Sequence, residues 1–503
     1  MLTRLRVSGF KNLLDLDLHF GPFTCIAGVN GAGKSNLFDA VHLLSDLASH
    51  SLVDAAQSVR AAGRRAGDVD SLFFRTGGDA VSAMSFAVEM IVPCEAVDDL
   101  GQTAAPSITF VDYRLELARR RDAAASRLGP LEIVKEELGH INLGEAYKHL
   151  PFPHRAATWR RSAVAGLRRA PFISTEGDGD QRVVTLHQDG GGGGPRSVPA
   201  QTLPRTVLSA ADAGSSPTAL AARREMQSWR LLQLEPASLR EPDDFGAPAN
   251  LAGNGAHLAA TLNRLAGSGP PVTSGGLRIA GAAAGPPQPA AAQLYGQVAA
   301  RLAELVDDVR EVREVRVEAD EKRELLTLMV SGGDGAAHAA RALSDGALRL
   351  LAFTVLAIDP RAGGLLCIED PEDGIHPARL PALLRLLQTI PTNVDEVVGP
   401  GNPLRQVIVN TCSAAVVSGV PDASLLIAEP RAASSHGHGA RSAVFRCLAG
   451  TWRARLAGGA EGSQPMSRGE LLDQMHLFQG PGPGERPRRA TRRKDPQPLL
   501  PYS

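Results

Sequence analysis

The residues best suited to chemistry form a glycine-rich segment near the start of the chain. Residues 28–35 read Gly-Val-Asn-Gly-Ala-Gly-Lys-Ser, and they follow an apolar run over residues 23–27. The glycines allow successive backbone N–H groups to point into one concavity, which suits anionic oxygens. A helix expected over residues 35–44 would add the positive end of its dipole. The segment therefore predicts a phosphate-binding loop between a strand and a helix.

A lysine and a serine in this loop are placed to bind phosphates and their metal. Lys34 can reach the β- and γ-phosphates, and the Ser35 hydroxyl can ligate Mg²⁺. ATP and Mg²⁺ are therefore the expected cofactors, and Lys34 is also counted among the catalytic residues. The nucleotide-binding residues predicted in the loop are Asn30, Gly31, Gly33, Lys34, Ser35 and Asn36.

An acidic pair far along the chain supplies the partner that such a loop requires. Residues 365–368 are apolar and predict a buried parallel strand, which Glu369 and Asp370 follow. Ligands bind at the carboxyl ends of strands in open α/β sheets, so these carboxylates belong beside the phosphates. Glu369 is predicted to act on Mg²⁺, directly or through water, and Asp370 to orient and polarise the attacking water. The alternative is a strand that ends in ordinary surface acids.

A second candidate anion site precedes this strand. Ser344 and Gly346 stand at the start of a helix whose residues 348–358 are apolar nearly all round, so the helix is buried. A helix N terminus that carries Ser and Gly can hold an anion. Because one nucleotide needs only one such cradle, we expect Ser344 and Gly346 to close on the nucleotide of another copy. The alternative is a plain helix cap.

The apolar pattern divides the rest of the chain. Alternation predicts strands at residues 2–7, 13–20, 80–92, 111–117, 131–138 and 183–187, the later ones in an antiparallel sheet with one wet face. Helical periodicity follows at residues 220–232, 257–265 and 291–309, and a second α/β block covers residues 325–430. Together with the family resemblance described below, these patterns imply an N-terminal ATPase lobe (1–140), an insertion with a β tip and a helical lid (141–310), a C-terminal ATPase lobe (311–430), an extension (431–480) and a disordered basic tail (481–503).

Bulk composition excludes several classes of protein. Lys plus Arg is 53 and Asp plus Glu is 54, so any nucleic-acid surface must be a local patch. The five cysteines have no C-x-x-C spacing and predict reduced thiols of a cytoplasmic protein, not a disulfide framework or a zinc site. No apolar run reaches the length of a membrane helix, so no membrane partner is expected. The basic tail is read as a solvated segment or, alternatively, as a nonspecific nucleic-acid arm.

Four segments together resemble the ABC-type ATPase heads of the RecF, SMC and OLD group, and in particular the bacterial stand-alone AAA family ATPases. They are residues 7–13 before the loop, the loop at 30–36, the signature-like residues 343–346 and the Walker B-like residues 368–377. The resemblance covers roughly residues 1–140 and 310–430. It is specific as a set, because each motif alone is short.

The resemblance implies an α/β fold, an ABC-type P-loop head with a mixed sheet and an antiparallel β lobe, split by a large and partly helical insertion. It implies a homodimer in which two heads sandwich ATP, with Ser344 of one copy meeting the γ-phosphate held by Lys34 of the other. Hydrolysis would open the dimer and act on DNA or on a separately encoded effector, in DNA repair or phage defence.

Two departures from the group bear on turnover. The group has Glu where this chain has Asp370, and a shorter side chain places water less well. The group's switch histidine follows a strand, whereas here residues 406–409 lead to Asn410, Thr411, Cys412 and Ser413. A thiol is a weak hydrogen-bond donor. Either hydrolysis is slow, or Asn410, Thr411 or Ser413 substitutes, and the alternative function is a nucleotide-gated interaction module that hydrolyses ATP slowly or not at all.

Other functions find less support in the sequence. A transporter ATPase subunit is disfavoured by the large insertion and by Ser-Asp-Gly at residues 344–346. About 70 residues follow residue 430, and Glu461, Glu470 and Asp473 form no acidic cluster, so a nuclease in the same chain is not expected. His436 and His438 lie in a Ser/Gly-rich loop and are weak candidates for a metal site.

Overall fold

The computed structural model describes most of the chain. Statements below concern residues 1–59, 69–76, 79–120, 128–189, 194–267, 289–305, 314–331, 336–432, 441–456 and 464–479. The predicted basic tail and the pair His436 and His438 lie outside these residues.

A six-stranded sheet at the centre of the molecule carries the candidate site. Its strands are, in spatial order, β14 (Arg230–Leu232), β19 (Gly364–Glu369), β20 (Arg405–Thr411), β3 (Phe23–Gly28), β21 (Leu425–Ala432) and β22 (Arg441–Cys447). All neighbours pair in parallel except β21 and β22. Strands that are distant in sequence therefore end at one edge, and this edge collects the predicted loop and the acidic pair.

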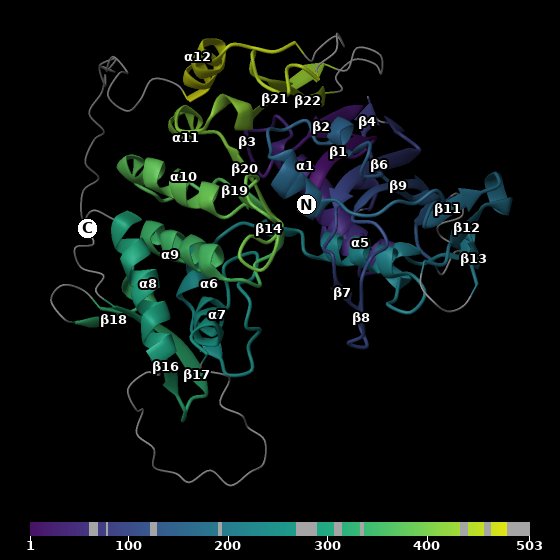
Figure 1. The fold of residues 1–503 in the computed structure, drawn as a ribbon. Coiled ribbons are helices and arrows are strands. Elements are labelled where there is room, and N and C mark those ends of the chain that lie inside the picture. The colour runs from purple at the N-terminus through teal and green to yellow at the C-terminus, as the bar shows by residue number, and fades with distance from the viewer. Residues whose placement is uncertain are drawn as a thin grey trace, which may run out of the picture.

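The two faces of this sheet pack against different layers. Leu365 and Cys367 of β19 belong to one apolar core, and Leu366 and Ile368 belong to another. This alternation follows from the period of two along a strand. Helices α1 (Lys34–Leu47) and α5 (Pro217–Gln227) cover the first face, and α9 (Asp345–Ile358), α10 (Leu380–Thr389) and α11 (Ala414–Ser418) cover the second (Figure 1).

An eight-stranded antiparallel sheet lies beyond α1 and α5 and shares their core. The antiparallel arrangement expected for the first half of the chain is confirmed. Figure 1 shows this sheet on the opposite side of the central sheet from α9 and α10. Its strands are, in spatial order, β13 (Arg196–Pro199), β12 (Val183–Leu186), β11 (Ile173–Glu176), β10 (Leu131–His140), β9 (Phe110–Arg119), β6 (Ala83–Ile91), β1 (Leu2–Ser8) and β2 (Leu16–His19).

Smaller elements complete the described fold. A third sheet contains β15 (Asp243–Asp244), β17 (Leu325–Ser331), β16 (Glu314–Asp320) and β18 (Ala337–Ala339), and it packs with α7 (Leu258–Leu265) and α8 (Pro289–Leu305). The remaining pieces are α2 (Leu52–Ser58), β4 (Arg75–Thr76), β5 (Asp79–Ala80), β7 (Ala96–Val97), β8 (Thr103–Ala104), α3 (Ala146–His149), α4 (Arg161–Ala163), α6 (Pro236–Arg240) and α12 (Arg468–Gln479).

One predicted helix is shorter than the sequence pattern indicated. The expectation of a helix over residues 220–232 is wrong at its end, because α5 stops at Gln227 and Arg230–Leu232 forms β14. Parallel pairing of β14 with β19 competes successfully with helical continuation there. Thus residues 141–310, predicted as an insertion, contribute β11–β13 to the antiparallel sheet and β14 to the central sheet. The domain boundaries at 140 and 310 stay a prediction.

The helices of the described residues are also informative about membranes. None of them combines the length and the apolar content that a membrane-spanning helix needs.

Candidate functional site

The glycine-rich loop connects β3 to α1, as its sequence predicted. β3 ends at Gly28 and α1 begins at Lys34. A side chain at Gly28 would collide with the carbonyl oxygen of Ala428 in β21. Gly33 has φ +103°, and a Cβ there would lie 2.5 Å from the Cβ of Ala443. These two glycines let the loop lie directly on the neighbouring strands β21 and β22, which fixes its position at the edge of the sheet.

Lys34 is buried and folded back onto its own loop. Its Nζ donates to the carbonyl oxygens of Gly28, at 2.7 Å, and Val29, at 3.0 Å. Burial lowers the pKa of Lys34, whereas Cys412, Asp370 and the neighbouring carboxylates act to raise it. The ammonium group therefore lies in the field of the acidic strand, and the structure brings these two predicted halves of the site together.

The segment before β2 braces the helix that follows the loop. Asn36 donates from Nδ2 to Oδ1 of Asn12, at 2.7 Å. Lys11 forms an ion pair with the buried Asp39 of α1, with 2.6 Å between Nζ and Oδ2. Asn36, predicted to touch the nucleotide, thus has a structural contact. In the sequence, these contacts were indicated only by the presence of Lys11 and Asn12 in the motif at residues 7–13.

The tip of the loop is open. Asn30, Gly31 and Ser35 are exposed, and Gly31 has φ +79° with no atom within 4 Å of where its Cβ would be. Backbone N–H groups of such a turn can bind anionic oxygens, and the Ser35 hydroxyl sits at the first turn of α1.

The acidic pair follows β19 at the same edge. Glu369 is paired in register with Asn410 of β20, whose Nδ2 donates to Glu369 Oε1 at 3.5 Å. The N–H of Asp370 donates to Oδ1 of the same asparagine at 3.1 Å. Asp370 has φ +39°, a conformation that few side-chain-bearing residues adopt. Asn410 therefore holds the turn that aims both carboxylates.

Asp370 is a poorer acid than an exposed aspartate. Burial raises its pKa, Asp373 adds to that effect, and Lys34 opposes it. The interaction between Asp370 and Lys34 is the electrostatic link between the acidic strand and the loop.

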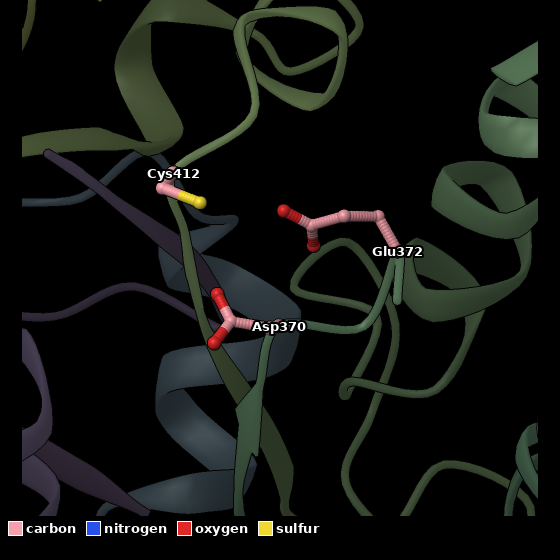
Figure 2. A group of neighbouring side chains, drawn as sticks. All are labelled: Asp370, Glu372 and Cys412. Atoms are coloured by element: carbon pink, nitrogen blue, oxygen red, sulfur yellow. The ribbon is translucent and has the colours of Figure 1, made fainter. Parts of the chain in front are cut away.

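Glu372 is a functional candidate to which the sequence analysis gave no role. Burial raises its pKa to about 7. Its Oε1 accepts a hydrogen bond from the Thr411 hydroxyl, whereas Oε2 is closed off from solvent and has no hydrogen-bond partner. Figure 2 shows Glu372, Asp370 and Cys412 pointing toward a shared space. The acidic tetrapeptide at residues 369–372 was the available signal.

The signature-like residues lie at the start of α9. Ser344 caps this helix by accepting the N–H of Ala347 at 3.3 Å. A Cβ at Gly346 would lie 2.6 Å from the carbonyl oxygen of Gly374, so this glycine permits close contact with the loop after β19. Asp345 pairs with Arg240, and Ser344 is exposed. The capping role of Ser344 is seen directly, and its predicted anion-binding role stays a prediction.

The residues named above as substitutes for the switch histidine have other partners. Asn410 holds the Glu369–Asp370 turn, and Thr411 donates to Glu372. The Ser413 side chain caps α11 by accepting the N–H of Val416 at 3.4 Å. Cys412 faces the carboxylates, and burial raises the pKa of its thiol. The thiol therefore lies beside these carboxylates just after the end of β20.

The residues at this edge fit a magnesium nucleotide. The open turn offers N–H donors, Lys34 supplies a positive charge, and the Ser35 hydroxyl and Glu369 are oxygen ligands of the kind Mg²⁺ prefers. The predicted nucleotide-binding and metal-binding roles of these residues remain predictions that this fit supports.

Comparisons with known proteins agree with this geometry. Residues 279–418 match the family described as "AAA domain, putative AbiEii toxin, Type IV TA system". The chain is similar to an OLD nuclease of Thermus scotoductus, with 50% identity over 44 residues, 9% of this chain and 8% of that protein. It is also similar to the DNA replication and repair protein RecF of Parabacteroides distasonis, with 45% identity over 51 residues, 10% of this chain and 14% of that protein.

Similarity to RecF extends further in another bacterium, although all these matches are short. RecF of Porphyromonas gingivalis is 33% identical over 85 residues, 17% of this chain and 23% of that protein. The matched segments thus span less than a quarter of each relative. Among solved structures, the SmcHead bound to the C-winged helix domain of ScpA aligns over 89% of this chain and 98% of its own, with TM-score 0.44 and 12% identity.

A second solved structure is similar at the same level. The Smc head domain with an extended coiled coil, bound to the C-terminal domain of ScpA from Pyrococcus furiosus, covers 88% of this chain and 96% of its own at TM-score 0.42 and 10% identity. The family match, the RecF and OLD relatives and the loop and acidic strand at one sheet edge lead to one assignment. The chain is similar to the RecF, SMC and OLD group of ABC-type ATPases, and it has an α/β fold with a P-loop at one edge of its central sheet.

Proposed function

We propose that this protein binds and hydrolyses ATP with Mg²⁺ and dimerises around the nucleotide to control DNA or a partner effector. The observation that carries the proposal is the meeting of Lys34 with Glu369 and Asp370 at the carboxyl edge of a parallel sheet. In this site Lys34 and the loop N–H groups bind phosphate oxygens, Ser35 and Glu369 hold Mg²⁺, and Asp370 orients water.

The dimer is supported by the exposed N terminus of α9. Ser344 and Asp345 face solvent, and the close contact between Gly346 and the loop after β19 fixes the start of the helix. A second copy can present its nucleotide to this end of the helix, so that ATP lies between two heads. The relatives named "DNA replication and repair protein RecF" and "OLD nuclease" suggest DNA as the object of the resulting motion, in repair. Defence against phage is the other role that the resemblance to the RecF, SMC and OLD group implies.

Nucleotide binding is tested by the Lys34→Ala variant. We expect calorimetry with magnesium ATP to show binding to the parent and a loss of at least about tenfold in affinity for the variant, because a charge-assisted contact to phosphate disappears. Lys148→Ala removes an exposed lysine elsewhere and should bind as the parent does. Equal affinity in all three proteins would contradict the proposed site.

Dimerisation is tested by the Asp370→Ala variant. This variant should bind ATP but hydrolyse it poorly, so that size-exclusion chromatography with ATP shows a dimer that is absent without nucleotide. A monomer under both conditions would count against the sandwich. DNA binding that survives removal of residues 481–503 would place the DNA site within residues 1–480.

A second candidate function is a nucleotide-gated switch with slow or no hydrolysis. Cys412 favours it, because a thiol faces the carboxylates where the group has histidine. A Cys412→His variant should then hydrolyse ATP faster than the parent in a steady-state assay. An unchanged rate would remove the reason for this alternative.

A further inference from the structure

Two carboxylates and a thiol converge beside the proposed nucleotide site. The ligand atoms of Asp370, Glu372 and Cys412 all lie within 4.8 Å of one another. Figure 2 shows the three side chains directed at a common space from the loop after β19 and from the end of β20. None of the three belongs to the pair Ser35 and Glu369 expected to hold Mg²⁺.

An unsatisfied oxygen points to a ligand in this space. Oε2 of Glu372 is shut off from solvent and has no hydrogen-bond partner, although Oε1 of the same carboxylate accepts from Thr411. A desolvated carboxylate oxygen without a partner is costly, and a cation satisfies it. This observation is independent of the clustering, because acidic side chains can also gather at a surface where water hydrates all their oxygen atoms.

The surrounding charges leave room for a doubly charged ion. The carboxylates that act on Asp370 and Glu372 come from Glu369, Asp373 and the pair itself, which makes four negative charges. Lys34 and Arg349 act on Asp370 as the opposing cations. With every one of these carboxyl groups ionised, four negative and two positive charges leave a surplus of two negative charges, which a divalent cation neutralises. Because the pKa values of Asp370 and Glu372 are raised, the cation displaces any proton that they retain when it binds.

We propose that Asp370, Glu372 and Cys412 form a site for a thiophilic divalent cation such as Zn²⁺. A thiolate with two carboxylate oxygens suits a borderline-soft ion, whereas Mg²⁺ prefers oxygen ligands alone. In a tetrahedral zinc site the ligand atoms lie about 3.5 Å apart. Shifts of about 1 Å in the side-chain atoms would therefore bring the three ligand atoms to that separation. The Cys412 thiol loses its proton to solvent as the metal–sulfur bond forms, and water takes the fourth position.

The test uses Cd²⁺ as an ultraviolet probe of thiolate coordination, with the full chain and no nucleotide. Titration should give a sulfur-to-metal charge-transfer band that saturates at one equivalent and is displaced by Zn²⁺. Cys412→Ser should lose the band, and Cys94→Ser, at an exposed cysteine elsewhere, should keep it. Asp370→Asn and Glu372→Gln should each weaken Cd²⁺ binding by at least about tenfold, since even outer contacts of a metal site are worth that much.

Four results would overturn the assignment. They are the absence of the band from the parent, a band that persists in Cys412→Ser, a band equally reduced in Cys94→Ser, and displacement of one equivalent of Cd²⁺ by millimolar Mg²⁺. Far-ultraviolet circular dichroism on each variant separates loss of a ligand from loss of the fold.

The effect of the cation on ATP hydrolysis rests on the proposed function, whereas binding of the cation does not. A cation on Asp370 removes the carboxylate proposed to orient water, so Zn²⁺ should inhibit hydrolysis by the parent and spare Cys412→Ser. Failure of ATP to bind would leave the Cd²⁺ titration interpretable, because that titration contains no nucleotide. Conversely, an absent charge-transfer band would leave the nucleotide site intact and remove only the thiophilic cation.

Discussion

Two glutamates in different parts of the molecule, Glu136 buried and Glu372 half-buried, have the same altered acidity for the same reason. Glu136 lies on β10 of the antiparallel sheet, and Glu372 lies beside the end of β19 in the candidate site. Burial raises the pKa of each carboxyl group to about 7. By acidity alone the two positions would be equally good candidates for a functional site.

Their hydrogen bonds separate them. Glu136 accepts the N–H of Val207 on Oε2 at 2.7 Å, the N–H of Leu208 on Oε1 at 2.8 Å and the Tyr113 hydroxyl at 3.2 Å. Glu372 has an oxygen with no partner. A raised pKa therefore reports burial in both places, and the unsatisfied oxygen distinguishes a carboxylate that can take a ligand from one that fastens a loop to a sheet.

The sharpest way to break this comparison is to replace Glu136 with its amide. Both oxygens of Glu136 accept from backbone N–H groups, so either orientation of the amide that replaces the carboxylate would turn an –NH₂ toward an N–H. We expect Glu136→Gln to lower the free energy of unfolding by about 2 kcal/mol in urea denaturation. Glu137→Gln, on the partly exposed position next to it, should change stability by less than about 0.5 kcal/mol. Equal effects would mean that the Glu136 bonds contribute little.

The pH dependence of stability gives the next largest effect. The folded pKa of Glu136 is about 7 and its ordinary value is 4.5. Between these values the unfolded chain has lost the proton while the folded chain retains it, so the free energy of unfolding falls as pH rises from about 4.5 to 7. Below this window both states are protonated, and above it both are ionised, so the contribution is then constant.

The Glu136→Gln variant lacks this contribution to the pH dependence of the free energy of unfolding. We expect the parent to lose about 1 to 2 kcal/mol more than Glu136→Gln across the window, against an upper limit of about 1.4 kcal/mol per pH unit for one proton. Glu372 is present in both proteins, so its contribution cancels in the difference. Denaturation at three pH values measures the effect, and parallel slopes for the two proteins would show that the pKa of Glu136 is not raised.

A third prediction tests how tightly the glycine-rich loop of the candidate site packs on β21. Gly28 touches Ala428 so closely that no side chain fits, whereas Gly31 has open space around it. Gly28→Ala should therefore destabilise the fold by about 1 to 2 kcal/mol more than Gly31→Ala, because only the first change overpacks. Both glycines have φ values unfavourable for alanine, which makes Gly31 a matched control for strain. Equal losses would indicate that the loop is free to move away from β21.

The position of Glu136 shows where a sequence pattern stops being sufficient. Alternation from Leu131 predicts that residues 133, 135 and 137 face the core. The pairing of β10 with β9 shifts register between Ile133 and Lys135, so Glu136 and Leu138 turn inward instead. A one-residue bulge turns the side chains that follow it to the opposite face of the sheet, and the local sequence does not predict such a bulge.

The candidate site divides in the same way. Its glycine-rich half was predictable because glycines, lysine and helix start are fixed by residues close in sequence, from Gly28 to Ser35. Its other half depends on the parallel pairing of β19 with β20, which places Asn410 and Thr411 beside residues 369–372. The sequence shows which residue types are present, but not which of them meet. Their contacts depend on strand pairing between segments about 40 positions apart in the chain.

The smallest expected effect completes the contrast between the two glutamates. Glu372→Gln keeps an oxygen for the Thr411 hydroxyl, and its –NH₂ would occupy the position of an oxygen that has no partner to lose. The free energy of unfolding should therefore change by less than about 0.5 kcal/mol at neutral pH, in the same urea assay that shows the loss for Glu136→Gln. A Thr411→Val control removes the hydrogen bond to Glu372 and also the one that the Thr411 hydroxyl accepts from the N–H of Ser413, so it should cost about 1 to 2 kcal/mol and confirm that the assay detects contacts at this place. If Glu372→Gln proves as damaging as Glu136→Gln, Oε2 of Glu372 must already have a structural partner, and the distinction between a fastening carboxylate and a ligand-ready one would not hold.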